Sequence, residues 1–181
     1  MTASWIIGML ESSGIPTVII GGIAMRLHDS SRLTQDLDLS VAATTVDKAV
    51  RTLYKEGYVL VCAVTEEAAT VCGTVEAAES WIEGTDPGSL TLIRRPQQLL
   101  SKPSYDVPHR DIEVESQVDL LYDLAVPFGH LLHDANETEI NGVRVRYASD
   151  RHLLRLKEAR QDKTAADYAD IAYLRARIEN R

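Results

Sequence analysis

Residues 18–39, VIIGGIAMRLHDSSRLTQDLDL, carry the clearest structural pattern of this chain. A short β-branched run precedes a glycine pair, a helical stretch follows, and Asp36 and Asp38 then alternate with Leu37 and Leu39. Side chains two apart in a strand point to the same face, so we expect the leucines to face the core and the aspartates to lie side by side on the other face. Two carboxylates at that separation repel each other, and a divalent cation between them relieves the repulsion.

The glycine pair indicates the kind of ligand that would bind together with the cation. Gly21 and Gly22 stand between a strand and a helix, where backbone N–H groups can approach a phosphate closely and a helix start adds a favourable dipole. Mg²⁺ is usually held by one or two carboxylates together with substrate phosphates. Each motif alone is weak evidence for a nucleotide site, because a lone Asp-x-Asp more often lies on a solvated strand face and a lone Gly-Gly more often forms a turn. Together they predict a nucleoside triphosphate on the glycine turn, with its metal held by Asp36 and Asp38.

The same residues resemble the signature of a known family. Gly21-Gly22 followed by Arg32-x-Thr34-x-Asp36-x-Asp38 is similar to the motif of the polymerase-beta-type nucleotidyltransferase superfamily. The likeness is greatest to small bacterial nucleotidyltransferase-like proteins, including toxins of abortive-infection and toxin–antitoxin systems. Two further features match the family. The first is a third acidic residue, Asp119, in Val118–Leu121, and the second is Lys157-x-x-Arg160 followed by Asp167-x-x-Asp170 near the C-terminus. The likeness extends over residues 16–40 and 113–174.

The resemblance implies a Mg²⁺-dependent enzyme that moves a nucleoside monophosphate from a nucleoside triphosphate to an acceptor hydroxyl. It implies a tRNA end or a protein side chain as acceptor, and an antitoxin protein as partner. Two alternatives stay open: a non-catalytic binding protein that keeps the fold, and a drug-modifying nucleotidyltransferase. The residues implied are Asp36, Asp38 and Asp119 as catalytic ligands of two Mg²⁺ ions, and Gly21, Gly22, Arg32, Thr34 and Lys157 as nucleotide-binding residues.

Several of these side chains also have plainer interpretations. Arg32 could reach a phosphate, or could pair at the surface with Asp29 or Asp36. Lys157 lies in an otherwise apolar helical stretch, so its ammonium either extends to solvent or points at the triphosphate. His28 could contact the nucleotide or cap the preceding helix. Asp167 and Asp170 are expected to pair with Arg160 or Lys163 and to hold two C-terminal helices together.

Composition sets the remaining bounds. The chain has 181 residues, a formal net charge of −8 and two cysteines. The negative charge argues against a broad, non-specific nucleic-acid surface, although it permits a local basic groove. Cys62 and Cys72 lack a second pair at zinc spacing and are expected to be reduced thiols. We find neither a signal peptide nor a membrane-spanning run, so the sequence predicts a cytoplasmic protein without membrane contact.

The pattern along the chain predicts an α/β (α+β) fold, with a small mixed β-sheet flanked by helices. We expect a nucleotidyltransferase-like core over residues 1–147 and a C-terminal helical segment over residues 148–181. Asn141-Gly142 predicts a hairpin with a type I′ turn. Residues 65–83 are ambiguous, with an alanine content that favours helix, and residues 95–110 are expected to be irregular. Strands are expected at 16–20, 37–41, 58–64, 89–94, 113–121, 139–140 and 143–147, and helices at 3–13, 22–28, 45–55, 127–134, 150–161 and 165–179.

Overall fold

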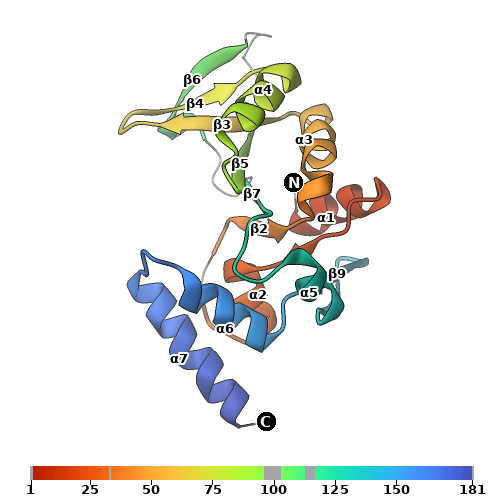
Figure 1. The fold of residues 1–181 in the computed structure, drawn as a ribbon, viewed down its shortest axis with the longest axis vertical. Helices are drawn as coiled ribbons and strands as arrows, with labels where there is room; N and C mark the ends of the chain where they lie inside the picture. The colour runs from red at the N-terminus through yellow and green to blue at the C-terminus, as the bar shows by residue number, and fades with distance from the viewer. Residues whose placement is uncertain (1, 33, 96–102, 113–116, 181) are drawn as a thin grey trace.

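A single mixed sheet runs through the molecule in the computed structural model, which describes residues 2–32, 34–95, 103–112 and 117–180 (Figure 1). Its nine strands lie in the order β6-β4-β3-β5-β7-β2-β1-β9-β8. The predicted α/β class, a mixed sheet flanked by helices, is therefore confirmed. The strands are β1 (Val18–Ile19), β2 (Leu37–Ser40), β3 (Tyr58–Val64), β4 (Ala68–Cys72), β5 (Ser89–Arg94), β6 (Ser104–Pro108), β7 (Val118–Leu121), β8 (Asn136–Ile140) and β9 (Val143–Tyr147).

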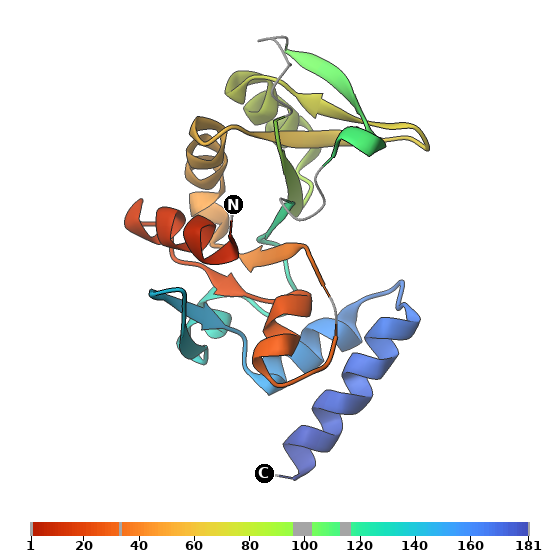
Figure 2. The same cartoon turned by 180° about the vertical axis from the view of Figure 1, so that it is seen from behind.

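The helices flank this sheet in groups that follow the chain. The N-terminal helix contacts β9, the next lies beside β2, the third and fourth contact each other and β3, and the last two pack together. Figure 2 shows the C-terminal pair at the end of the molecule opposite β3 to β6. The α-helices are α1 (Ala3–Ser12), α2 (Gly21–Leu27), α3 (Val46–Lys55), α4 (Val75–Thr85), α5 (Phe128–His133), α6 (Asp150–Ala159) and α7 (Ala165–Glu179), and short 3₁₀ turns span Ala43–Thr45 and His109–Asp111.

The centre of the sheet consists of β7, β2, β1 and β9. Strand β2 pairs with β7 in parallel and with β1 antiparallel, and β1 pairs in parallel with β9. The alternation seen in the sequence is observed here, since Leu37 and Leu39 are buried in the main core while Asp36 and Asp38 are partly exposed. The apolar side of the strand therefore anchors β2, and the acidic side is free to form a site.

The hairpin prediction is confirmed as well. Strands β8 and β9 pair antiparallel, with Ile140 opposite Val143, and the turn between them is Asn141-Gly142. Both turn residues have positive φ, 51° for Asn141 and 79° for Gly142, as a type I′ turn requires.

Two parts of residues 65–112 differ from the sequence prediction. The alanine-containing stretch 65–83 divides into strand β4 and helix α4, because β4 is held between β3 and β6 and cross-strand pairing outweighs helix propensity. Within residues 95–110, expected to be irregular, Ser104–Pro108 forms the edge strand β6. Residues 96–102 of that stretch, and residues 113–116 of the strand predicted at 113–121, lie outside the described residues.

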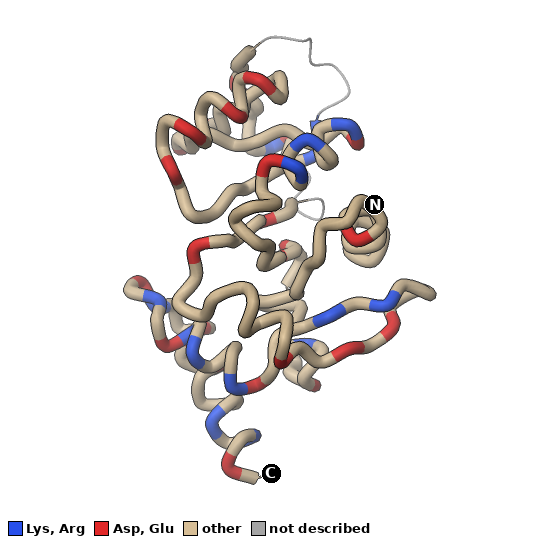
Figure 3. The backbone as a smooth tube through the Cα atoms, turned by 45° about the vertical axis from the view of Figure 1, so that its right-hand side comes forward, with Lys and Arg blue, Asp and Glu red and all other residues tan. Residues whose placement is uncertain are grey.

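The last two helices carry basic and acidic residues in equal number, five of each, on a protein whose formal net charge is −8 (Figure 3). Helix α6 packs against α2 as well as α7, and Leu153 of α6 belongs to the main core. Among the described residues, we find no helix that is long and apolar enough to cross a membrane.

Candidate active site

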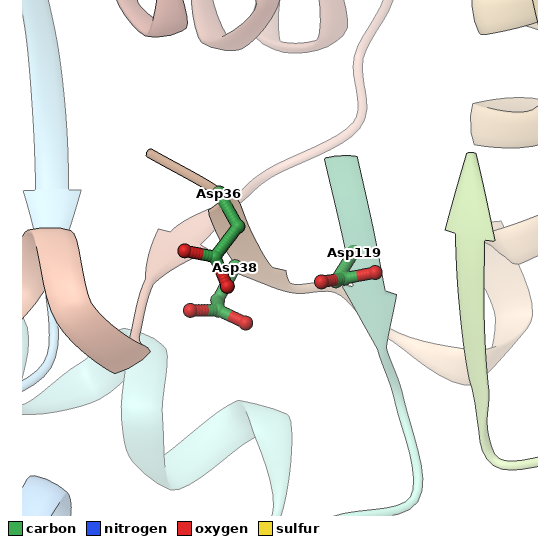
Figure 4. A group of neighbouring side chains, drawn as sticks. All are labelled: Asp36, Asp38 and Asp119. Atoms are coloured by element: carbon green, nitrogen blue, oxygen red, sulfur yellow. The ribbon is translucent and has the colours of Figure 1, made fainter. Parts of the chain in front are cut away.

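Three carboxylates converge on the exposed side of the central strands. Asp38 on β2 lies directly opposite Asp119 on the parallel strand β7, and Asp36 stands two residues before Asp38 on the same side. One carboxylate oxygen from each residue lies within 4.8 Å of one from each of the others (Figure 4). The structure thus brings together the three acidic residues that the sequence singled out.

Each carboxylate is held by its own hydrogen-bond donors. The Thr34 hydroxyl donates to Asp36 Oδ1 at 2.5 Å, and the backbone N–H of Gly22 donates to the Asp38 carboxylate. Asp119 is held from two sides, because Thr91 Oγ1 donates to its Oδ1 at 2.6 Å and Gln117 Nε2 donates to its Oδ2 at 3.0 Å. Charge-assisted hydrogen bonds of this kind fix the direction of a carboxylate.

Thr91 and Gln117 are the participants that sequence reasoning missed. Thr91 lies on β5 directly opposite Asp119 on β7, and this register joins residues 28 positions apart in the chain. No local motif marks that threonine. Gln117 could have been found, because a side chain two residues before a strand aspartate lies on the same face.

The three carboxylates carry more negative charge than their surroundings compensate. Burial, followed by the charges of Asp36 and Asp119, raises the pKa of Asp38 from 3.8 to about 7. Burial also raises the pKa of Asp119, against the opposing hydrogen bonds from Thr91 and Gln117. A site with three oxygen donors and a deficit of positive charge suits a hard divalent cation such as Mg²⁺, and these residues therefore fit the metal that the resemblance implies.

The two glycines are required by this arrangement. Gly21 has φ +62°, and a Cβ built on it would lie 1.8 Å from Asp38 Oδ2. A Cβ on Gly22 would lie 2.6 Å from the Cβ and from the hydroxyl oxygen of Thr34. Because each overlap is far below van der Waals contact, a side chain at either position would displace Asp38 or the threonine that holds Asp36.

The basic residues form a second cluster beside the acidic one. Lys157 is only 5% exposed, and its Nζ lies 2.9 Å from Asp167 Oδ1 and 2.7 Å from Asp170 Oδ2. This burial excludes the interpretation in which its ammonium extends to solvent. Arg32 pairs with Asp170, and not with Asp29 or Asp36, the alternative surface partners considered from the sequence.

Asp167 and Asp170 hold the last two helices together, as predicted, although with partly different partners. Arg160 Nη1 lies 3.0 Å from Asp167 Oδ1, whereas Lys163 donates to the carbonyl oxygen of Arg160. Asp167 also forms a capping box with Thr164 at the start of α7. Burial opposes its ionisation, but the bonds from Lys157 and Thr164 leave the pKa of Asp167 well below its usual range.

Both clusters line one cavity of about 540 Å³, a volume in the range of small-molecule sites. Its wall therefore has an acidic part, a basic part and an apolar part. Of the eight catalytic and nucleotide-binding residues that the resemblance implies, seven are in its lining and Thr34 is not. The lining consists of Ile20, Gly21, Gly22, Arg32, Asp36, Asp38, Asp119, Leu121, Asp123, Leu124, Ala125, Leu153, Leu156, Lys157, Ala159, Arg160 and Thr164.

His28 lies outside the cavity lining and joins parts of the fold. It is the C-cap residue of α2, and its buried ring bonds through Nε2 to the carbonyl oxygen of Ala148 at 2.8 Å. Its Nδ1 lies 2.8 Å from Asp150 Oδ1. The next residue, Asp29, has φ +65°, the conformation that glycine adopts most easily, and its carboxylate lies 3.3 Å from Arg177.

Comparison with solved structures shows which proteins share this architecture. The lincomycin-bound lincosamide antibiotic adenylyltransferase LnuA has a TM-score of 0.55 at 16% identity, covering 94% of this chain and 92% of that one. The candidate nucleotidyltransferase TM1012 of Thermotoga maritima has a TM-score of 0.52 at 13% identity, covering 98% and 90%. ANT(2″)-Ia in complex with adenylyl-2″-tobramycin has a TM-score of 0.51 at 12% identity, covering 96% and 85%.

This chain therefore has the fold of the nucleotidyltransferases. No protein-family model matches the sequence, and no curated protein matches it significantly.

Proposed function

We propose that this protein is a Mg²⁺-dependent nucleotidyltransferase. The observation that carries the proposal is the triad of Asp36, Asp38 and Asp119, whose oxygens lie within 4.8 Å of one another beside the glycine turn. The shared fold supports it. In the reaction, the oxygen of an acceptor hydroxyl attacks the α-phosphorus of a nucleoside triphosphate and forms a new P–O bond, and its proton passes to solvent. Pyrophosphate leaves as the bond from the α-phosphorus to the β-phosphate breaks.

Asp36, Asp38 and Asp119 would together hold two Mg²⁺ ions, with Asp119 completing the set of ligands. When bound, such ions neutralise charge that develops on the transferring phosphate and place the attacking oxygen in line. The donors from Thr34, Thr91 and Gln117 orient the carboxylates in advance. Positioning of this kind is the larger part of catalysis in phosphoryl transfer.

The basic cluster would face the phosphates, and its net charge indicates in which form the nucleotide would bind. Arg32, Lys157 and Arg160 supply three positive charges, and the two aspartates Asp167 and Asp170 remove two of them. One net positive charge is too little for a triphosphate beside three carboxylates, so the nucleotide would enter only as its metal complex. In this proposal the two aspartates keep the Lys157 ammonium fixed at the cavity wall, and the backbone of Gly21 and Gly22 approaches the phosphates.

More than one class of acceptor is compatible with the lining of the cavity. By resemblance, we propose the end of a tRNA or a protein side chain as acceptor, in a toxin that has an antitoxin partner. LnuA is a lincosamide antibiotic adenylyltransferase, and ANT(2″)-Ia forms a complex with adenylyl-2″-tobramycin, so both neighbours support a small drug as the alternative acceptor. A binding protein that has kept the site and lost the transfer is the non-enzymatic alternative.

A transfer assay separates these possibilities. The protein is incubated with Mg²⁺ and each α-labelled nucleoside triphosphate, together with total tRNA, a protein extract, lincomycin or tobramycin. We expect label on one acceptor class, and we expect Asp119→Asn to abolish it while triphosphate binding persists. Binding without transfer to any acceptor would favour the non-catalytic alternative.

The matched control for Asp119 is Asp106. Asp106 lies on the edge strand β6 and accepts a hydrogen bond from Thr70 on the neighbouring strand at 2.7 Å, as Asp119 does from Thr91. Asp106→Asn therefore removes a carboxylate from the same cross-strand arrangement, away from the cavity. Wild-type transfer by Asp119→Asn, or equal loss in both variants, would contradict the assigned role.

A further inference from the structure

The two cysteines of this chain lie against each other on neighbouring strands. Cys72 Sγ lies 3.1 Å from Cys62 Sγ, closer than two sulfur atoms in ordinary contact. Strands β3 and β4 pair with Leu60 opposite Cys72, and the register shifts by one residue between Val61 and Ala63. The extra residue at this bulge is Cys62, and the shift brings its side chain towards Cys72.

The two thiols differ in access. Cys72 is 4% exposed, and burial together with its hydrogen bond to Cys62 raises the pKa of its thiol to about 12. Cys62 is only partly buried, and its thiol bonds to the carbonyl oxygen of Thr70 at 3.4 Å. An oxidant from solvent therefore meets Cys62 first, with Cys72 already in place behind it.

We propose that Cys62 and Cys72 form a reversible intramolecular disulfide when the protein meets a peroxide. The Cys62 thiol releases its proton to solvent and the thiolate attacks one peroxide oxygen. An S–O bond forms as the O–O bond breaks, and the departing hydroxide takes up that proton and leaves as water. The Cys72 sulfur then attacks the sulfur of the resulting sulfenic acid. The S–S bond forms, the S–O bond breaks, and the thiol proton of Cys72 leaves with the hydroxide as water. The two thiols are oxidised and the peroxide is reduced.

The bond would join strands that already pair, so it needs little backbone movement. It closes a short loop between β3 and β4, which restricts the unfolded chain and stabilises the hairpin. Neither cysteine lines the cavity described above. Disulfide formation is therefore independent of the proposed transferase activity, and its absence would leave that activity unchanged.

Hydrogen peroxide treatment of the full chain tests the proposal. After quenching, the protein is denatured, alkylated and weighed by mass spectrometry. We expect wild-type protein to lose two hydrogens and both alkylatable thiols without dimerising, to recover both with dithiothreitol, and to melt at a higher temperature while oxidised. Two thiols that remain alkylatable, or sulfinic and sulfonic acids on wild-type Cys62 without a disulfide, would overturn it.

Two serine variants test the oxidation of Cys62 and the attack by Cys72 separately. Cys72→Ser removes the resolving thiol, so Cys62 should stop at the sulfenic acid and react with dimedone. Cys62→Ser should leave Cys72 largely unoxidised at the same peroxide concentration, because that thiol is buried and protonated. Oxidation of Cys72 at the wild-type rate in Cys62→Ser would contradict the proposed order. The wild-type result stands by itself if either variant folds poorly.

Discussion

Replacing Asp38 with asparagine should make the metal-free protein more stable, although the residue lies at the centre of the candidate site. The pKa of Asp38 rises from 3.8 to about 7 on folding, first because it is buried and then because Asp36 and Asp119 repel its charge. The folded state therefore binds the proton of the Asp38 carboxyl group more tightly than the unfolded state does. Stability falls as pH rises through the interval between these two pKa values.

The size of the effect follows from the two pKa values. Each pKa unit corresponds to about 1.4 kcal/mol, so a rise of roughly three units destabilises the folded state by up to about 4 kcal/mol above pH 7. Asp38→Asn keeps the shape and an oxygen that can accept from Gly22, but it has no charge to desolvate. The increase in its free energy of unfolding over that of wild type should be absent near pH 4, grow as pH rises to about 7, and stay constant above that.

Urea unfolding in EDTA, repeated across this pH range, measures the difference directly. Asp123→Asn is the control, since Asp123 is exposed, lines the same cavity and does not belong to the triad. Added Mg²⁺ should stabilise wild type and have little effect on Asp38→Asn, because a ligand stabilises only the state that binds it. A gain at pH 8 within about 0.5 kcal/mol, the range of an ordinary surface substitution, would refute the argument.

Three further variants test other contacts of the site. Lys157→Met removes the ammonium that lies between two buried carboxylates, and we expect a loss of about 3–5 kcal/mol in denaturant unfolding. Gly21→Ala forces a Cβ onto the Asp38 carboxylate, so calorimetry should show loss of Mg²⁺-triphosphate binding together with lower stability. Thr91→Val should leave triphosphate affinity near wild type and lower turnover by about 10-fold, since a charge-assisted hydrogen bond contributes about 1.5–3 kcal/mol and Gln117 still holds Asp119.

Each of these variants has a matched control. Arg175→Met removes an exposed ion pair with Glu158 and should change stability by less than about 1 kcal/mol. Gly142→Ala imposes a side chain on a residue with φ +79° where nothing lies within 4 Å, so it separates backbone strain from steric overlap. Thr70→Val removes the same kind of cross-strand hydrogen bond at the edge of the sheet and should not affect turnover. Equal effects in a variant and its control would contradict the contact assigned to that variant.

The sequence alone determined the parts of the protein that rest on local periodicity. Alternation of Leu37 and Leu39 with Asp36 and Asp38 predicted both the buried side of β2 and the acidic side, because the two-residue repeat of a strand leaves no other arrangement. Asn141-Gly142 predicted its hairpin for a similar reason, since the turn type requires positive φ at two adjacent residues.

Only the tertiary structure decided which distant residues meet. Thr91 reaches Asp119 because β5 pairs with β7, and Arg32 reaches Asp170 because α7 packs against α6, where Asp170 also pairs with Lys157. Strand β4 was ambiguous in sequence, because its alanines suit a helix until β3 and β6 supply backbone partners on both sides. Nearest-neighbour chemistry fixes the geometry of a single strand or turn, whereas strand order and ion-pair choice depend on the free energy of the whole packed chain. The acidic motif could therefore be read from adjacent residues, and the donors that orient it could not.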